Sequence, residues 1–207
     1  TEDGVVVVDS RGGPIITERA AQRTWRVRAS GFWQVHRGAA DHFAAVVCDL
    51  AAARPGDSVL DLYSGAGLFA GALAASVGPT GTLTAVESVV DAVRDARRSL
   101  SDLGNIELVH ADVNVWLQRH QNRKYSIVVA DPPRSGLGAA NVALVSGVAQ
   151  RAFVYVSCEP SALARDTRTL AESGWRLDRL IGIDAFPMTA HVECIALFTP
   201  TPSEKVR

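Results

Sequence analysis

The stretch SVLDLYSGAGLFAGALAASVG (Ser58–Gly78) decides the fold. It begins as an apolar run of strand length, passes through a glycine-rich turn, and continues as an apolar helical pattern that ends in glycine. Glycine lets a backbone pass close to a ligand, and the helix N-terminus beside it favours negative charge. The spacing Gly65-x-Gly67-x-x-Ala70 also matches a dinucleotide fingerprint, a weak signal. The stretch predicts a βα unit beside a small-molecule site; a turn that only packs helix against strand is the alternative.

The same alternation of apolar runs and helical patterns extends from Phe32 to Pro200. It predicts an α/β fold: a Rossmann-like, mostly parallel sheet with an antiparallel C-terminal strand pair. Strands are expected at 58–64, 81–88, 106–112, 125–133 and 152–158, with the final pair at 175–186 and 191–200. Helices are expected at 41–53, 65–78, 89–104, 113–121, 141–150 and 161–173. Residues 1–30 are short, β-branched runs broken by Gly-Gly-Pro, which predicts strands and turns, and 201–207 is a polar tail.

Composition narrows the class of protein without identifying it. The chain has 207 residues, of which 47% are hydrophobic and 21% charged, and a formal net charge of -1. This is a globular composition with no global basic field, which argues only weakly against a nucleic-acid partner. Cys48, Cys158 and Cys194 show no CxxC spacing, so we expect a reduced, cytoplasmic setting and no metal. No leader and no apolar run of about 18 residues is found, so no membrane association is expected.

Acidic residues stand where three successive predicted strands end, at Asp61, Glu87 and Asp112. Glu87 lies about twenty residues after the glycine turn, where a carboxylate can accept hydrogen bonds from two ribose hydroxyls. One such residue is often just a helix cap. Three of them around one crevice of a parallel sheet favour a nucleoside pocket.

The fourth predicted strand ends in VVADPPR (Val128–Arg134). A carboxylate and two prolines make a rigid loop with few donors, which favours methyl transfer over hydride transfer by a nicotinamide dehydrogenase. Amino-group methyltransferases often carry a similar loop that ends in an aromatic residue, but here Arg134 stands in that place. The alternative, that this stretch is only a proline-rich turn that caps a helix, remains open.

Five motifs occur in order along the chain: SGFWQVH (30–36), DLYSGAGLF (61–69), ADPPRSGLG (130–138), VYVSCEPSALARD (154–166) and FPMTAHVECIALF (186–198). Together they resemble the catalytic domain of the RNA uracil-5-methyltransferases, which use S-adenosylmethionine. The resemblance implies a methyltransferase domain at 31–200, with 1–30 the end of a preceding central domain. Because the chain opens on Thr1, we expect it to be a fragment of a longer protein.

The resemblance also implies roles for individual residues. The nucleophile would be Cys158 and the base Glu193, whereas Gln34, Tyr63, Glu87 and Asp131 would bind the cofactor, along with the glycine turn (Gly65, Gly67); Asp112 is added from the strand-end pattern. The substrate would be a uridine in tRNA or rRNA, and we expect a monomer. Some members hold an iron–sulfur cluster with four cysteines; this chain has too few for one. Two residues depart from the family pattern. Glu159 stands where Asn or Asp is common, and Leu68 stands where Asn is common.

The chemistry explains why these residue types are needed. A thiolate added to carbon 6 of uracil makes carbon 5 nucleophilic, and a base must later remove the carbon-5 proton. We expect the start of the following helix to lower the pKa of the Cys158 thiol, and Glu159 to point away from the sulfur. Arg165 and Arg168 are candidates for RNA phosphates. Taken alone, Cys158 would more often be core. An exocyclic-amine methyltransferase and a cofactor-binding fragment inactive without its RNA-binding domains are the alternatives.

Overall fold

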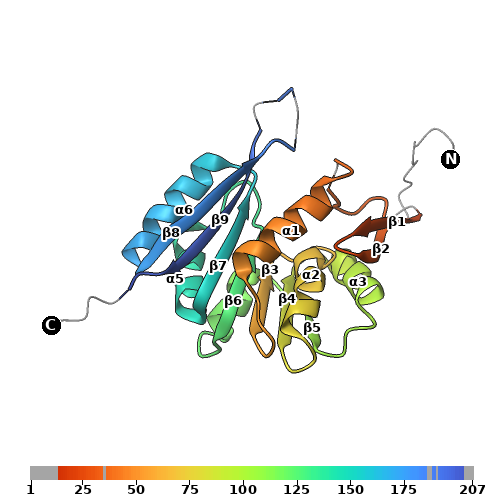
Figure 1. Ribbon diagram of the computed structural model, residues 1–207, viewed down its shortest axis with the longest axis horizontal. Coiled ribbons are helices and arrows are strands. Elements are labelled where there is room, and N and C mark those ends of the chain that lie inside the picture. The colour runs from red at the N-terminus through yellow and green to blue at the C-terminus, as the bar shows by residue number, and fades with distance from the viewer. Residues whose placement is uncertain (1–13, 35, 186–187, 190, 203–207) are drawn as a thin grey trace.

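The computed structural model describes residues 14–34, 36–185, 188–189 and 191–202. A seven-stranded sheet forms its centre, and a two-stranded hairpin, β1–β2, lies at the end of the molecule opposite β8 (Figure 1). The strands are β1 (Ile15–Ala20), β2 (Arg23–Arg28), β3 (Ser58–Leu62), β4 (Thr82–Glu87), β5 (Ile106–His110), β6 (Tyr125–Ala130), β7 (Ala149–Ser157), β8 (Trp175–Ile183) and β9 (Glu193–Pro200). The helices are α1 (Ala39–Ala51), α2 (Leu68–Val77), α3 (Val90–Ser99), α4 (Val113–Arg119), α5 (Gly138–Val148) and α6 (Pro160–Glu172).

The order of strands across the sheet is β5-β4-β3-β6-β7-β9-β8. The five strands from β5 to β7 are parallel, whereas β9 pairs antiparallel with both β7 and β8. This arrangement confirms the predicted fold class. The strand order reverses between β3 and β6, and ligands of open α/β sheets bind at such a switch point, beyond the carboxyl ends of the strands.

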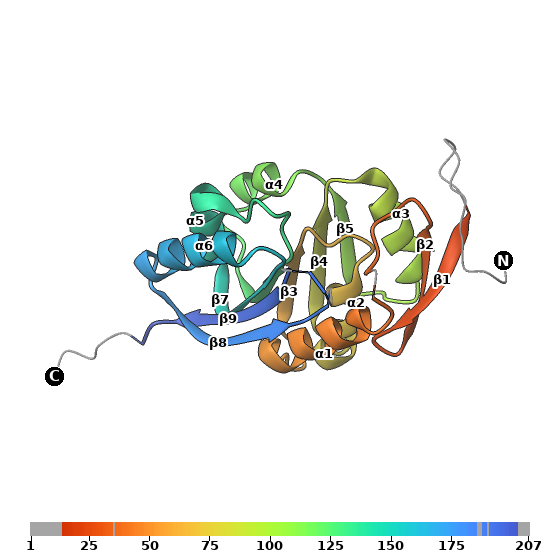
Figure 2. The same cartoon turned by 90° about the horizontal axis from the view of Figure 1, so that it is seen from above.

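Helices cover both faces of the sheet. Figure 2 shows α4, α5 and α6 on one face and α1 and α2 on the other. The central strands β3, β4 and β6 are buried along nearly their whole length, as expected for parallel strands covered on both sides. Two apolar clusters result, one under α1 and α2 that includes Phe43 and Leu73, and one under α4 to α6 that includes Leu117 and Val145.

The β1–β2 hairpin shares the first of these clusters. Trp25 is fully buried, and its indole N–H donates to the carbonyl of Ala20 at 2.9 Å. On the same strand, the backbone N–H of Arg28 donates to Asp95 Oδ2 of α3 at 2.8 Å. The described part of residues 1–30 therefore packs into the same core as the sheet, and the domain boundary at residue 30 stays a prediction. The run GVVVVDS (4–10) lies outside the described residues.

The element boundaries around α5 differ from those predicted, and α3 ends at Ser99, five residues before its predicted end. A helix was predicted at 141–150, but α5 spans Gly138–Val148 and β7 begins at Ala149, three residues before the predicted strand. The helix begins earlier because its first backbone N–H groups receive a cap from α6, which lies far along the sequence. Within the part of the chain that the structure describes, no helix is long and apolar enough to cross a membrane.

Candidate active site

A cavity of about 650 Å³ opens at the carboxyl ends of the central strands. It includes most of the residues that the sequence predicts to be functional. Those lining it are Gln34, Tyr63, Gly65, Glu87, Asp131, Cys158 and Glu193. They come from the loop after β2, the ends of β3, β4, β6 and β7, and the start of β9. The fold thus gathers residues that are up to 159 positions apart (193 minus 34) in one cavity.

The pairing of β7 with β9 places Cys158 next to Glu193. Ser157, the last residue of β7, is opposite Cys194 of the antiparallel β9. Cys158 and Glu193 are the next residues beyond this pair on the two strands, so their side chains reach the same edge of the sheet. Cys158 is half-buried and Glu193 is buried. A thiol and a carboxylic acid therefore face one cavity on a rigid strand pair.

Three carboxyl groups lie close together at this edge of the sheet, those of Asp131, Asp61 and Glu193. Burial, with the charges of Glu193 and Asp61, raises the pKa of Asp131 to about 8. Burial raises the pKa of Asp61 to about 7, although its Oδ2 accepts a hydrogen bond from the Ala70 N–H at 2.9 Å. Burial also raises the pKa of Glu193, which the positive charge of Arg134 opposes. At neutral pH this region can therefore hold protons that exposed carboxylates would release.

The thiol does not have the lowered pKa that the sequence predicts. Burial raises the pKa of Cys158, and the negative charges of Glu193 and Asp131 raise it further. A hydrogen bond to the backbone and the charge of Arg134 act in the opposite direction but are smaller causes. The prediction considered the helix start and Glu159, and it missed the two carboxylates at the ends of neighbouring strands. In the absence of substrate, the site favours the protonated thiol.

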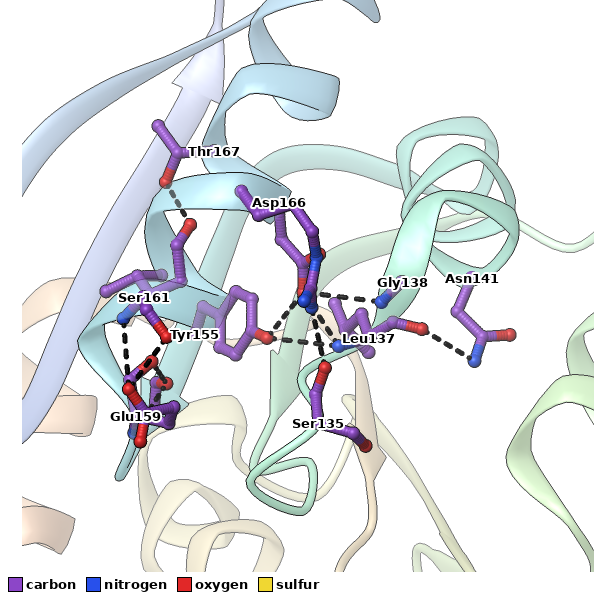
Figure 3. Close-up of polar contacts among 12 residues, drawn as sticks. Ser135, Leu137, Gly138, Asn141, Tyr155, Glu159, Ser161, Asp166 and Thr167 are labelled. Carbon is purple, nitrogen blue, oxygen red and sulfur yellow. Dashed lines mark hydrogen bonds and ion pairs between the residues drawn. The ribbon is translucent and has the colours of Figure 1, made fainter.

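Glu159 has a local structural role. Its carboxylate accepts hydrogen bonds from the backbone N–H of Ser161 at 3.3 Å and from the Ser161 hydroxyl at 2.8 Å (Figure 3). It is thereby the N-cap of α6. These bonds also hold the pKa of the Glu159 carboxyl below its usual value. The longer side chain at this position is thus used to start the helix, and its direction relative to the sulfur stays a prediction.

The carboxylate of Glu87 supports the glycine turn. Its Oε2 accepts from the backbone N–H of Gly65 at 2.9 Å, and its Oε1 accepts from that of Val89 at 2.7 Å. Oε1 also accepts from the Ser88 hydroxyl at 3.3 Å, so the lone pair that can accept a further hydrogen bond is on Oε2. Glu87 can therefore bind a ligand hydroxyl without releasing the loop.

Tyr63 and Gln34 are also held by their neighbours. Tyr63 has a left-handed backbone (φ 58°), and its hydroxyl accepts from Asn141 Nδ2 at 3.3 Å. A non-glycine residue at positive φ is uncommon and costs energy, so surrounding contacts must hold it there. Gln34 follows Trp33, whose ring packs against Trp25 with centroids 5.7 Å apart. The hairpin core thus fixes the position of Gln34 at the cavity.

Two predicted cofactor residues, Gly67 and Asp112, do not line the cavity. Gly67 has φ 86°, and a Cβ there would lie 2.7 Å from Leu100 Cδ1, so its close approach is to α3 rather than to a ligand. Asp112 is exposed, and its Oδ1 accepts from the Val115 N–H at 3.0 Å as the N-cap of α4. Packing against α3 accounts for Gly67, and capping of α4 accounts for Asp112.

Several cavity residues were not predicted as site residues. Phe32, 74% exposed, lines the cavity although its motif SGFWQVH suggested only Gln34. Arg134 and His191 line it as well. Arg28 of β2 also reaches the cavity and pairs with Asp91 of α3 at 3.0 Å, a contact for which the sequence carries no local signal.

The predicted phosphate-binding arginines lie outside the cavity lining. Arg165 Nη2 donates to the Ser135 carbonyl at 2.6 Å, so this guanidinium supports the loop after β6. Arg168 is exposed on the same helix. Among the described residues, no group of three or more His, Cys, Asp or Glu could hold a metal ion.

Comparisons with known proteins agree on one family. The family model for tRNA (uracil-5-)-methyltransferase matches residues 16–200. An uncharacterized RNA methyltransferase of Streptomyces coelicolor is 44% identical over 189 residues, covering 91% of this chain and 41% of that protein. The 23S rRNA (uracil(1939)-C(5))-methyltransferase of Acinetobacter baylyi is 36% identical over 171 residues, covering 81% of this chain and 37% of its own.

A solved structure gives the same result. The Pyrococcus abyssi tRNA (uracil-54, C5)-methyltransferase in complex with S-adenosyl-L-homocysteine has a TM-score of 0.75 and 28% identity, covering 91% of this chain and 45% of that chain. The chain spans less than half the length of these relatives.

Proposed function

The chain belongs to the tRNA (uracil-5-)methyltransferase family, and from this premise we propose that it methylates carbon 5 of a uridine in tRNA or rRNA through a covalent Cys158–uracil adduct. The observation that carries the proposal is the placement of Cys158 and Glu193 at adjacent strand ends in one cavity. An enzyme that methylates an exocyclic amine needs neither a thiol nor this pairing.

The cavity is suited to S-adenosylmethionine, which when bound supplies an electrophilic methyl group. Its volume of about 650 Å³ lies within the usual range for small-molecule sites. Glu87 Oε2 has a lone pair left for a ribose hydroxyl, and Gln34, Tyr63 and Gly65 line the same cavity. Asp131, which also lines the cavity, would accept from an amino group. We infer that these five residues hold the cofactor.

Cys158 begins the reaction as a thiolate. The sulfur bonds to carbon 6 of uracil, and the electron pair of the carbon 5–carbon 6 double bond moves into the enolate. Carbon 5 then takes the methyl group, whose bonding pair leaves with the cofactor's sulfur. Glu193 removes the proton from carbon 5, and the electrons left behind re-form the double bond as the bond from carbon 6 to Sγ breaks. Cys158 leaves as a thiolate, and Glu193 passes its proton to solvent.

The electrostatics of the site bear on both steps. Burial raises the pKa of Glu193, which makes its carboxylate a stronger base than an exposed glutamate. The carboxylates that raise the pKa of Cys158 oppose its activation, whereas the charge of Arg134 favours the thiolate. We infer that Arg134 assists the thiolate when the substrate excludes water from the cavity.

The RNA would have to present an unpaired or flipped uridine, because carbon 6 cannot be reached within a stacked helix. We further propose that 1–30 is the end of a preceding domain, as the resemblance implies, and that such a domain contributes to RNA binding. The match to less than half of each relative's length is consistent with this division.

Substitution of the two reacting residues tests the proposal, in the protein at its natural length with tRNA and rRNA lacking 5-methyluridine. We expect Glu193→Gln to accumulate a covalent protein–RNA adduct, because proton removal fails after methyl transfer. Cys158→Ala should give neither adduct nor product. Cys48→Ala, which removes another half-buried thiol on α1, is the matched control and should retain activity.

Two other outcomes would point to different functions. Product formation by Cys158→Ala at the wild-type rate would favour amine methylation without covalent catalysis. Calorimetric binding of S-adenosylhomocysteine without any methyl transfer would identify a cofactor-binding chain that needs further parts.

A further inference from the structure

A buried carboxylate on α6 holds the loop that follows β6. Asp166 is 1% exposed, and its Oδ2 accepts hydrogen bonds from the Leu137 N–H at 2.7 Å and the Gly138 N–H at 3.3 Å (Figure 3). The Tyr155 hydroxyl on β7 donates to the same oxygen at 2.8 Å. Because α5 has no side-chain cap of its own at Leu137, Asp166 caps this helix from another element.

The loop approaches α6 so closely that only glycine fits at its centre. Gly136 has φ 76°, and a Cβ there would lie 2.6 Å from Asp166 Oδ2 and 2.8 Å from Arg165 Nη2. Arg165 Nη2 also donates to the Ser135 carbonyl at 2.6 Å. Three consecutive loop residues, 135–137, therefore contact one turn of α6.

This contact joins the two halves of the site. The loop carries Asp131 and Arg134 into the cavity, and α6 begins two residues after Cys158. The first half of the loop has its own anchor, because the Asp131 N–H donates to the Leu62 carbonyl at 3.3 Å. The second half, which includes Arg134, is held by α6 and by the Tyr155 hydroxyl of β7, which accepts from the Leu137 N–H at 3.1 Å. Within the described part of the chain, the exposed guanidinium of Arg134 makes no hydrogen bond or ion pair, so the backbone must set its position.

We propose that Asp166 is a positioning residue, which holds the second half of the loop on α6 and so keeps Arg134 beside Cys158. The proposal rests on the proposed function for its importance to methyl transfer, but the coupling itself is a property of the free protein. Asp166 touches neither the cavity nor the reacting atoms.

A double-mutant cycle on the reactivity of Cys158 tests the coupling. The rate of carboxamidomethylation of Cys158 by iodoacetamide is measured by peptide mass spectrometry, with neither RNA nor cofactor present. Removing the positive charge in Arg134→Gln should slow the reaction about two- to threefold, because less thiolate is present. Asp166→Asn should slow it in the same direction. In the double variant, Asp166→Asn should add no further slowing, because the charge that it positions is gone.

A second variant keeps the carboxylate and displaces the loop. Gly136→Ala should slow alkylation as Asp166→Asn does, and it provides the test if Asp166→Asn does not fold. Gly174→Ala is the matched control: Gly174 has φ 82° at the other end of α6, but a Cβ there meets nothing within 4 Å. It should carry the same backbone strain and leave the alkylation rate unchanged.

The outcomes separate positioning from a purely structural role. The proposal would be overturned if Asp166→Asn slowed alkylation equally with and without Arg134. It would also be overturned if neither Asp166→Asn nor Gly136→Ala slowed alkylation. In methyl transfer we expect Asp166→Asn to lower kcat about tenfold or more, with the affinity for S-adenosylhomocysteine within about twofold of wild type. Absence of methyl transfer by the wild-type protein would refute the proposed function alone, since the alkylation cycle needs no substrate.

Discussion

Replacement of Glu193 by glutamine should have opposite effects on the two reactions of Cys158. Without RNA, the variant should alkylate faster than wild type, because the negative charge that raises the pKa of the thiol is gone. With RNA, turnover should stop, because the base is gone. A residue that served only to pack the start of β9 would not produce this divergence.

The size of the first effect follows from the strand pairing. Side chains directly opposite on antiparallel strands have Cβ atoms about 5 Å apart. At that separation two charges interact by about 3 kcal/mol at an effective dielectric constant near 20. Because Cys158 is only half-buried, solvent screens most of this, and about 1 kcal/mol remains. A thiol of lower pKa is also a weaker nucleophile, so the net acceleration should be about two- to fivefold.

The assay is iodoacetamide labelling of the Cys158 peptide at about pH 8, below full ionisation of the thiol. Glu159→Gln is the matched control, since this carboxylate is adjacent to Cys158 in sequence but bonds to Ser161. It should change the rate little. Slower or unchanged labelling in Glu193→Gln, or equal acceleration in both variants, would refute the placement of Glu193 beside the sulfur.

Three further predictions concern the stability of the protein and the binding of the cofactor product. Asp61 has a pKa of about 7 in the folded protein against 3.8 for an ordinary aspartate, so its contribution to stability is lost as pH rises through this range. In thermal melts, the gain in stability of Asp61→Asn over wild type should therefore grow from pH 5 to pH 8. A difference that stays constant with pH would contradict this prediction. Gly67→Ala should lower the free energy of unfolding by about 2–4 kcal/mol through overpacking on Leu100 and backbone strain, whereas Gly174→Ala (φ 82°, open space) should show only the strain, about 1–2 kcal/mol, as measured by urea denaturation. Glu87→Gln should weaken calorimetric binding of S-adenosylhomocysteine about tenfold or more, and unchanged affinity would remove Glu87 from the cofactor site.

The sequence predicts the fold well because each central strand is a short, continuous apolar run. The run at Ser58–Leu62, its glycine turn and the acidic residue at the end of the next strand are local signals, and all belong to one edge of the sheet. The pairing of β7 with β9 is not local, and its register brings Glu193 to Cys158. The sequence predicts the pair of Cys158 and Glu193 only through the resemblance to a family, not through a local pattern.

Other features depend on contacts that no local pattern records. Burial raises the pKa of Cys158, and two carboxylates at the ends of neighbouring strands raise it further; a reading of its own strand and helix could not include these carboxylates. Asp112 and Gly67 match a ligand-binding pattern, yet the cap of α4 and the packing against α3 account for them. The hydrogen bond that the Leu137 N–H donates to Asp166 joins residues 29 positions apart, and nothing near either residue predicts it.

The direction of β9 has a consequence for how this chain can be altered. Glu193 is the first residue of its strand, where it pairs with Ile183 of β8, and the ladder between β9 and β7 lies entirely after it, in the pairs from Cys194 to Phe198. On β7 the same ladder lies entirely before Cys158. New chain ends opened between β8 and β9, as in a circular permutation, would therefore leave the β7–β9 ladder whole. Such a permuted protein should keep its thiol and its carboxylate face to face.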